Sequence, residues 1–201
     1  MLNILEASRV NKVKRILLMS STEVYESDKN DGYIQSKKFA ETAARLYFTE
    51  YGMDISVARA GNTYGPGESL GKDRGRVITT FISKSLNGEN IEIWGSGKQE
   101  NSFLYVKDLV DGLLKLVEKH PKPDPIDFVS SDKISILETA RTVNNITNSS
   151  SKLVFKEFEE VVIKRRTISN KKAKRLLGFG EEVGFIKGLE KTIKYYKQNK
   201  V

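Results

Sequence analysis

The sequence contains no cysteine and a single histidine. The absence of cysteine excludes disulfide bonds, cysteine-ligated iron–sulfur clusters and thiolate zinc sites. The one histidine has no second ligand at metal-binding spacing, so we predict no metal site.

Long apolar runs are also missing, because no stretch approaches the roughly 18 residues that a membrane-spanning helix needs. The opening segment MLNILEA has the pattern of an amphipathic helix and lacks the basic and long apolar regions of a signal peptide. The 201 residues are 38% hydrophobic and 30% charged, a composition typical of a soluble globular protein. We therefore expect a cytoplasmic protein and no membrane partner.

Acidic residues are outnumbered, with 34 Lys and Arg against 26 Asp and Glu and a net charge of +8. Such a charge suits nucleic acid, anionic membranes or a phosphorylated substrate. The densest basic stretch, residues 164–175, contains none of the aromatic residues that stack on single-stranded nucleic acid. We interpret it as a solvated surface. Nucleic-acid binding is kept as a third hypothesis, which the salt dependence of DNA binding would test.

Short apolar runs alternate with helical patterns along the chain. The predicted strands are 15–20, 54–59, 91–94, 126–129 and 152–158, and the predicted helices are 2–11, 33–52, 77–86, 106–119, one from about 135, 171–177 and 185–198. Alternation of this kind is typical of an α/β fold with a mostly parallel sheet. No linker or internal repeat divides the chain, so we expect a single α/β unit.

Tyr33 and Lys37 lie four residues apart at the start of a predicted helix. Residues at this spacing share one helix face, so the phenol and the ammonium can point into one pocket. A neighbouring ammonium favours the phenolate form of a tyrosine. The hydroxyl of Ser21, at the end of the strand before this helix, could complete a proton relay.

Several motifs follow one another in a fixed order. They are Ser20-Ser-Thr-Glu-Val-Tyr25, Tyr33-Ile-Gln-Ser-Lys37, Arg59-Ala-Gly-Asn-Thr-Tyr-Gly-Pro-Gly67, Ile93-Trp-Gly-Ser-Gly-Lys-Gln99, Phe103-Leu-Tyr-Val-Lys-Asp-Leu-Val110 and Lys172-Ala-Lys-Arg-Leu-Leu-Gly178. The set resembles the extended short-chain dehydrogenase/reductase family, in particular the NAD-dependent epimerase/dehydratase group that acts on nucleotide sugars.

The resemblance implies a fold and a division of the chain. The fold would be the C-terminal part of a Rossmann-type parallel sheet with a small α/β substrate-binding domain. Approximate ranges are 1–65 and 105–130 for the Rossmann part, and 66–104 and 131–201 for the substrate-binding part.

The resemblance also assigns roles to individual residues. The catalytic residues would be Ser21, Glu23, Tyr33 and Lys37. NAD or NADP would be bound by Tyr33, Lys37 and Ala60. The nucleotide-sugar substrate would be bound by Thr22, Asn62, Val77, Gln99 and Arg166, with Arg165 as an alternative phosphate-binding arginine.

The pair Thr22-Glu23 bears on the type of reaction. Family members that dehydrate or decarboxylate the sugar have a glutamate at the position of Glu23. Dehydratases of the dTDP-glucose type have an aspartic acid just before it, where this chain has Thr22. Epimerases, decarboxylases and other dehydratases therefore stay open, and so does a solvent-facing Glu23 without a catalytic role.

Two features of the family are missing. The sequence has no Gly-x-x-Gly-x-x-Gly turn for the cofactor pyrophosphate, and Glu100-Asn101 follows Gln99 where the family has a phosphate-binding arginine. We therefore expect an N-terminally truncated enzyme. The alternative is a non-catalytic relic or subunit that binds through the family's dimerisation helices. These helices would lie near Leu2 and over residues 33–51, and a homodimer through them is predicted.

Overall fold

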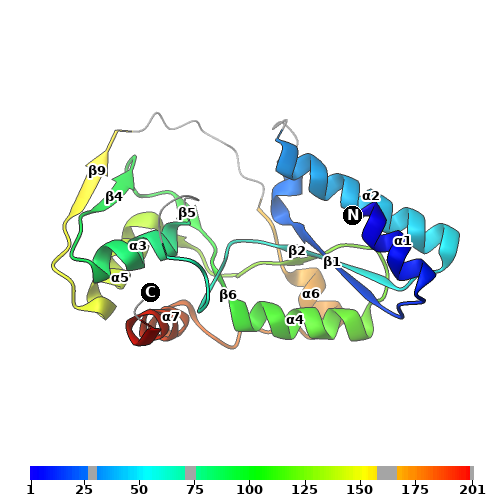
Figure 1. Ribbon diagram of the computed structural model, residues 1–201. Helices are drawn as coiled ribbons and strands as arrows, with labels where there is room; N and C mark the ends of the chain where they lie inside the picture. Colours follow the sequence, from blue (N-terminus) through cyan, green and yellow to red (C-terminus); the bar gives the residue numbers. More distant parts are fainter. Residues whose placement is uncertain (27–30, 71–75, 158–166, 200–201) are drawn as a thin grey trace. The chain divides into compact units, whose positions relative to one another are not determined.

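The computed structural model of the protein describes residues 1–26, 31–70, 76–157 and 167–199. The chain forms two compact units, each built from separate stretches of sequence. The first unit comprises Met1–Gly61, Asp108–Ser131 and Lys164–Glu181, and the second comprises Asn62–Lys107, Asp132–Ile163 and Glu182–Val201. Figure 1 labels most of the helices and strands of both units.

The first unit is built on a parallel sheet with the order β1-β2-β7, which are Ile16–Ser21, Ile55–Ala60 and Ile126–Phe128. Leu18 pairs with Val57, and Ala58 pairs with Ile126. The central strand β2 carries β-branched side chains, and Ile55 and Val57 are fully buried. Continuous burial of this kind is typical of a parallel strand covered on both faces.

Helices cover the two faces of this sheet. Helices α1 (Leu2–Val10) and α2 (Gly32–Tyr51) lie on one face, and α4 (Val106–Lys119) and α6 (Lys171–Leu177) lie on the other (Figure 1). Ala40, Ala43 and Ala44 of α2 are buried against the strands, where their small side chains let the helix approach closely. Gly52 ends α2 with a left-handed φ of 65°, as the sequence predicts.

The described residues of the second unit form short strands and three helices. The helices are α3 (Val77–Leu86), α5 (Ile136–Thr147) and α7 (Phe185–Asn199), and the strands are β3 (Thr63–Tyr64), β4 (Ile91–Trp94), β5 (Glu100–Asn101), β6 (Leu104–Tyr105), β8 (Ile134–Ser135) and β9 (Leu153–Lys156). β3 pairs with β6 and β4 with β9 in parallel, and β5 pairs with β8 antiparallel. A shared core around Ile82, Ile93 and Leu189 joins the helices to β4.

The predicted α/β class with a parallel sheet is confirmed. The structure groups α6 with the first unit, because α6 packs on β7, whereas residues 131–201 were predicted to belong to the substrate-binding part. The assignment of a cofactor role and a substrate role to the two parts stays a prediction. Within the described residues, no helix is both long and apolar enough to cross a membrane.

Candidate active site

Ser21 is the last residue of β1 and caps the 3₁₀ helix η1 (Thr22–Tyr25). Its side chain is buried, and its Oγ accepts a hydrogen bond from the backbone N–H of Glu23 at 3.2 Å. Ser21 pairs with Ala60 at the end of β2, and the Thr22 hydroxyl lies 3.5 Å from the Ala60 carbonyl oxygen. Three of the predicted site residues therefore meet at the carboxyl ends of two parallel strands, the edge at which open α/β sheets bind ligands.

Glu23 lies on η1 with an exposed side chain. The exposure does not distinguish a catalytic Glu23 from a solvent-facing Glu23 without a catalytic role, because a carboxylate that contacts substrate is also accessible from solvent.

Tyr33 and Lys37 lie in the first turns of α2, where the Asp31 side chain caps the helix by accepting the Tyr33 N–H at 2.6 Å. The Tyr33 side chain is about half exposed. The Lys37 Nζ lies 5.4 Å from the centre of the Tyr33 ring and donates a hydrogen bond to the Met19 carbonyl at 2.8 Å. Because Met19 precedes Ser21 by two residues, this bond brings the start of α2 to the end of β1.

Three of the predicted substrate-binding residues, Asn62, Val77 and Gln99, lie in the second unit, whereas Thr22 lies in the first. Asn62 has an exposed side chain, and its carbonyl accepts a hydrogen bond from the Leu104 N–H at 2.8 Å. Val77 begins α3 and packs against the core of that unit. The Gln99 side chain donates a hydrogen bond to the Trp94 carbonyl at 2.9 Å. Arg166 and its alternative Arg165 lie outside the described residues.

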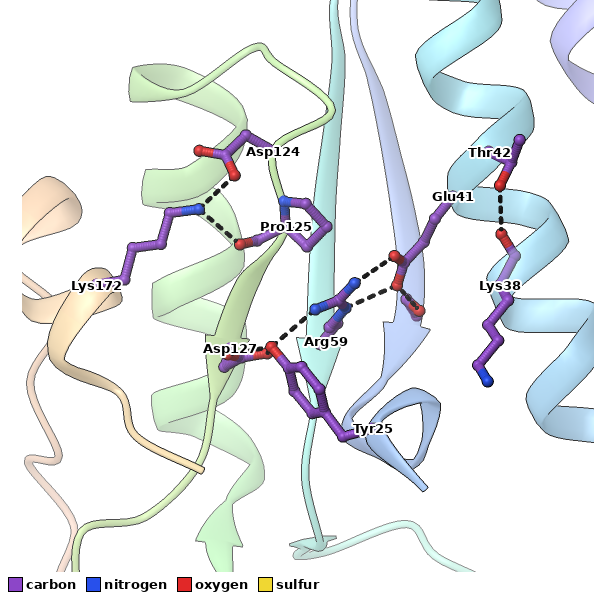
Figure 2. Close-up of polar contacts among 10 residues, drawn as sticks. Tyr25, Lys38, Glu41, Thr42, Arg59, Asp124, Pro125, Asp127 and Lys172 are labelled. Atoms are coloured by element: carbon purple, nitrogen blue, oxygen red, sulfur yellow. Dashed lines mark hydrogen bonds and ion pairs between the residues drawn. The ribbon is translucent and has the colours of Figure 1, made fainter. Parts of the chain in front are cut away.

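A buried polar network beneath this edge was not predicted from the sequence. The Arg59 guanidinium of β2 binds the Glu41 carboxylate of α2 through two hydrogen bonds, of 2.8 and 2.5 Å. Ser20 donates its hydroxyl to the same carboxylate at 2.5 Å. Arg59 also donates to the Tyr25 hydroxyl at 2.7 Å, and Tyr25 donates to Asp127 of β7 at 2.9 Å (Figure 2).

The electrostatics of this network are consistent with its geometry. Burial raises the pKa of Glu41, but the hydrogen bonds from Arg59 and Ser20 outweigh it, so the pKa lies below the ordinary 4.5. Burial raises the pKa of Asp127 above 3.8 in spite of the hydrogen bond from Tyr25 and the charge of Arg59. Burial and the bond to Asp127 raise the pKa of Tyr25, which keeps its hydroxyl available as a donor. Arg59 is held firmly in its charged form by Glu41, which raises its pKa.

The arrangement brings together a serine hydroxyl, a half-exposed phenol and a lysine ammonium at the ligand-binding edge of a parallel sheet. The sequence matches the NAD dependent epimerase/dehydratase family over residues 1–129. The chain belongs to this family.

Individual relatives show how far the similarity extends. The chain is 30% identical to a dTDP-4-dehydro-6-deoxy-D-allose reductase from a Streptomyces species, over 98% of this chain and 65% of that protein. It is 32% identical to UDP-glucuronic acid decarboxylase 1 of Xenopus tropicalis, over 92% of this chain and 47% of the relative. The structure of the Bordetella bronchiseptica enzyme WbmF in complex with NADH superposes with a TM-score of 0.86 at 29% identity, over 98% of this chain and 63% of that one.

These comparisons bear on the predictions from sequence. The family assignment, its NAD dependence and its Rossmann-type fold are confirmed. The chain spans about half to two thirds of the length of these three proteins. The roles of the individual site residues are not tested by these similarities and stay predictions.

Proposed function

We propose that this chain carries the catalytic and substrate-binding part of an NAD-dependent enzyme that acts on nucleotide sugars. The observation that carries the proposal is the convergence of Tyr33 and Lys37 on the end of β1, beside Ser21. Membership of the family and the nucleotide sugars in the relatives' names support the substrate class.

In the proposed reaction, Tyr33 acts as the general base. Its phenolate accepts the proton of a sugar hydroxyl, and the Ser21 hydroxyl orients the same oxygen by a hydrogen bond. The Lys37 ammonium, 5.4 Å from the ring, stabilises the phenolate by its charge. The bound cofactor supplies the acceptor for the hydride that leaves the carbon of that hydroxyl.

The residues present fit one end of an NAD or NADP molecule. Lys37 offers an ammonium donor to ribose hydroxyls, and Ala60 leaves room beside the strand ends because its side chain is a single methyl group. The sequence contains no glycine-rich turn for the pyrophosphate, so this chain supplies only the nicotinamide end of the site. We propose that the first unit binds this part of the cofactor and the second unit binds the nucleotide sugar.

The type of reaction depends on Glu23. A carboxyl group next to Ser21 can exchange a proton with a carbon beside the oxidised one. It would take the proton in a dehydration and return one after CO₂ has left in a decarboxylation, whereas an epimerase that inverts the oxidised carbon needs no such group. The several UDP-glucuronic acid decarboxylases among the relatives support the first group as a proposal. A cytoplasmic location also stays a prediction from the sequence.

The test is a chimera that joins the dinucleotide-binding half of a relative to the N-terminus of this chain. The purified chimera should convert a UDP- or dTDP-sugar in an NAD-dependent reaction. Chromatography of the products measures this conversion. Tyr33→Phe should abolish turnover, while Tyr51→Phe, at the other end of the same helix, should leave it unchanged. Full turnover by the Tyr33→Phe chimera would refute the proposed base.

We also propose a homodimer through α1 and α2. Phe39 and Leu46 lie seven residues apart on one face of α2 and are 55% and 53% exposed, and Ile4 of α1 is 61% exposed. Exposed apolar side chains gathered on adjacent helices mark protein–protein contacts. This surface would also serve the alternative hypothesis, a non-catalytic subunit that binds a partner through the same helices.

Analytical ultracentrifugation tests this surface. Phe39→Ser/Leu46→Ser should shift the protein from dimer to monomer. The matched control is Leu114→Ser, because Leu114 is a 67% exposed leucine of α4 outside this face. An unchanged sedimentation profile in the double variant would place the contact elsewhere. A chimera that forms the dimer but binds no NAD would favour the subunit hypothesis.

A further inference from the structure

Three residues of α2 are spaced four positions apart along one helix face: Tyr33, Lys37 and Glu41. Lys37 and Glu41 form hydrogen bonds with consecutive residues of β1. Lys37 donates to the Met19 carbonyl at 2.8 Å, and Glu41 accepts the Ser20 hydroxyl at 2.5 Å. Two successive turns of the helix are therefore fastened to two successive residues of the strand, directly before Ser21.

Arg59 connects this contact to the neighbouring strand. Its guanidinium binds both oxygens of the Glu41 carboxylate, and the side chains of Arg59 and Glu41 are only 16% and 6% exposed. A bidentate arginine–carboxylate pair has a fixed relative orientation, which a single point charge lacks. Helix α2 is thus held against β2 as well as β1.

Tyr25 extends the network to the turn that follows Ser21. It is the last residue of η1, its ring lies 4.8 Å from the Arg59 guanidinium, and its hydroxyl accepts from Arg59 and donates to Asp127 (Figure 2). The segment that carries Ser21 and Glu23 is therefore anchored at its start by Ser20 and at its end by Tyr25.

We propose that Glu41 and Arg59 are positioning residues that set the register of α2 on the sheet and so place Tyr33 and Lys37 opposite Ser21. The inference rests on the proposed function for its catalytic consequence. A slide of α2 by one turn, about 5.4 Å, would separate two buried charges from their partners. Fixing register is the best-supported use of buried ionic groups in proteins.

This role is separable from stability. A buried ion pair replaced by apolar residues of similar volume often leaves stability unchanged or raised. The triple variant Ser20→Ala/Glu41→Leu/Arg59→Met removes the three interacting polar groups together. It should keep the thermal midpoint of the parent while losing the fixed register.

The first measurement is turnover in the chimera described above. In the triple variant we expect kcat to fall by about 10²-fold, the usual cost of a misplacement near 1 Å, with KM for the nucleotide sugar little changed. In Arg59→Lys, which keeps the positive charge and loses the forked guanidinium, kcat should fall by about tenfold. The matched control is Ser85→Ala/Asn144→Leu, which replaces a partly buried polar pair bonded at 2.8 Å in the second unit and should leave kcat unchanged.

The second measurement does not depend on activity. The chain has no cysteine, so the exposed residues Lys14 and Gln35 can be changed to cysteine and spin-labelled without background. The labelled chain is freshly purified and diluted into unlabelled chain, so that only the two labels of one molecule are measured. Double electron–electron resonance should then give a narrow distance distribution in the parent. The distribution should be broad or shifted in the triple variant and in Arg59→Lys.

The two measurements separate the two proposals. An inactive parent chimera with a shifted distribution in the variants would refute the proposed function and leave the positioning role intact. A folded triple variant with parental kcat, or with the parental distance distribution, would overturn the positioning role. If the triple variant does not fold, Arg59→Lys provides the test, and a parental distance distribution in that variant would overturn the positioning role.

Discussion

Lys37 donates a hydrogen bond to the backbone carbonyl of Met19, at 2.8 Å, while its Nζ lies 5.4 Å from the Tyr33 ring. The ammonium thus has two tasks in one position. It stabilises the start of α2 on β1 and provides positive charge beside the proposed base. Substitutions of Lys37 should therefore affect catalysis more than stability, because the lost hydrogen bond lies at a partly exposed edge.

Lys37→Met in the active chimera is expected to reduce kcat by about 10³-fold, within the range for loss of general-base function. The methionine retains most of the aliphatic side chain, so the unfolding midpoint should fall only slightly. Lys38→Met, the adjacent lysine of the same helix (Figure 2), is the control and should retain parental turnover. Equal losses for the two variants would show that the charge at position 37 has no specific role.

The purified 201-residue chain alone is expected to turn over no nucleotide sugar. Its sequence lacks the glycine-rich turn that holds the pyrophosphate and so positions the nicotinamide for hydride transfer. Isothermal titration with NAD should give no heat of specific binding, whereas the chimera should bind. Robust NAD-dependent turnover by the unmodified chain would contradict this prediction.

Gly112 of α4 is packed so closely that no side chain fits. A Cβ atom there would lie 2.5 Å from the ring of Phe128 and 2.9 Å from that of Phe179. Gly112→Ala should therefore destabilise the fold by about 1–3 kcal/mol, the usual cost of overpacking a core. Gly180→Ala is the control, because a Cβ at Gly180 meets nothing within 4 Å. Urea unfolding followed by circular dichroism compares the two variants.

Acid should affect the buried network in two opposite ways. The pKa of Glu41 is lowered, so its stabilising contribution is complete above the ordinary 4.5 and is lost as the pH falls through the pKa in the folded protein. The pKa of Asp127 is raised above 3.8, so the folded protein binds this proton more tightly and acid restores some stability. The two contributions oppose each other around pH 4.

Asp127→Asn removes only the second contribution. The variant should lose unfolding free energy more steeply than the parent as the pH falls below 4.5, the ordinary pKa of Glu41. Asp54→Asn, which changes an exposed carboxylate, should follow the parental curve. Urea midpoints measured across this range give the comparison. A shallower curve for Asp127→Asn would show that protonation of Asp127 does not stabilise the folded protein.

The main elements of the fold are predictable from local patterns. Helix α4 was predicted over its full range because its apolar stripe repeats with the helical period, and β1 because it is a short continuous apolar run. The two-residue strands β3, β5, β6 and β8 were not predicted. A strand of two residues is too short to show a periodic pattern, and its pairing depends on a partner strand distant in the sequence.

The site is predictable to a similar extent and for similar reasons. Ser21, Tyr33 and Lys37 belong to motifs that resemblance identifies. The buried network was missed because Glu41 and Asp127 look like ordinary surface carboxylates when only neighbours in sequence are considered. Two signals were present: Glu41 continues the four-residue spacing of Tyr33 and Lys37, and Arg59 is a charge that continues the buried apolar run of β2.

The edge of β1 leads to a final prediction about self-association. In the described part of the sheet β1 pairs only with β2, and its residues Leu17 and Met19 are partly exposed while Leu18 faces the core. An apolar strand with one unpaired edge is a template for pairing with another chain. The 201-residue chain should therefore aggregate with time, and its β1 amides should exchange hydrogen faster than those of Ile55 and Val57 in β2.

A charge on the edge strand should suppress this association, because lysines are a common means of protecting exposed edges. Leu17→Lys should lower light scattering of the purified chain by severalfold. Leu114→Lys adds the same charge at a 67% exposed position of α4 and should leave scattering unchanged. Equal suppression by both variants would mean that net charge, not the strand edge, controls solubility. A monodisperse parent with slow exchange throughout β1 would show that this edge is already protected.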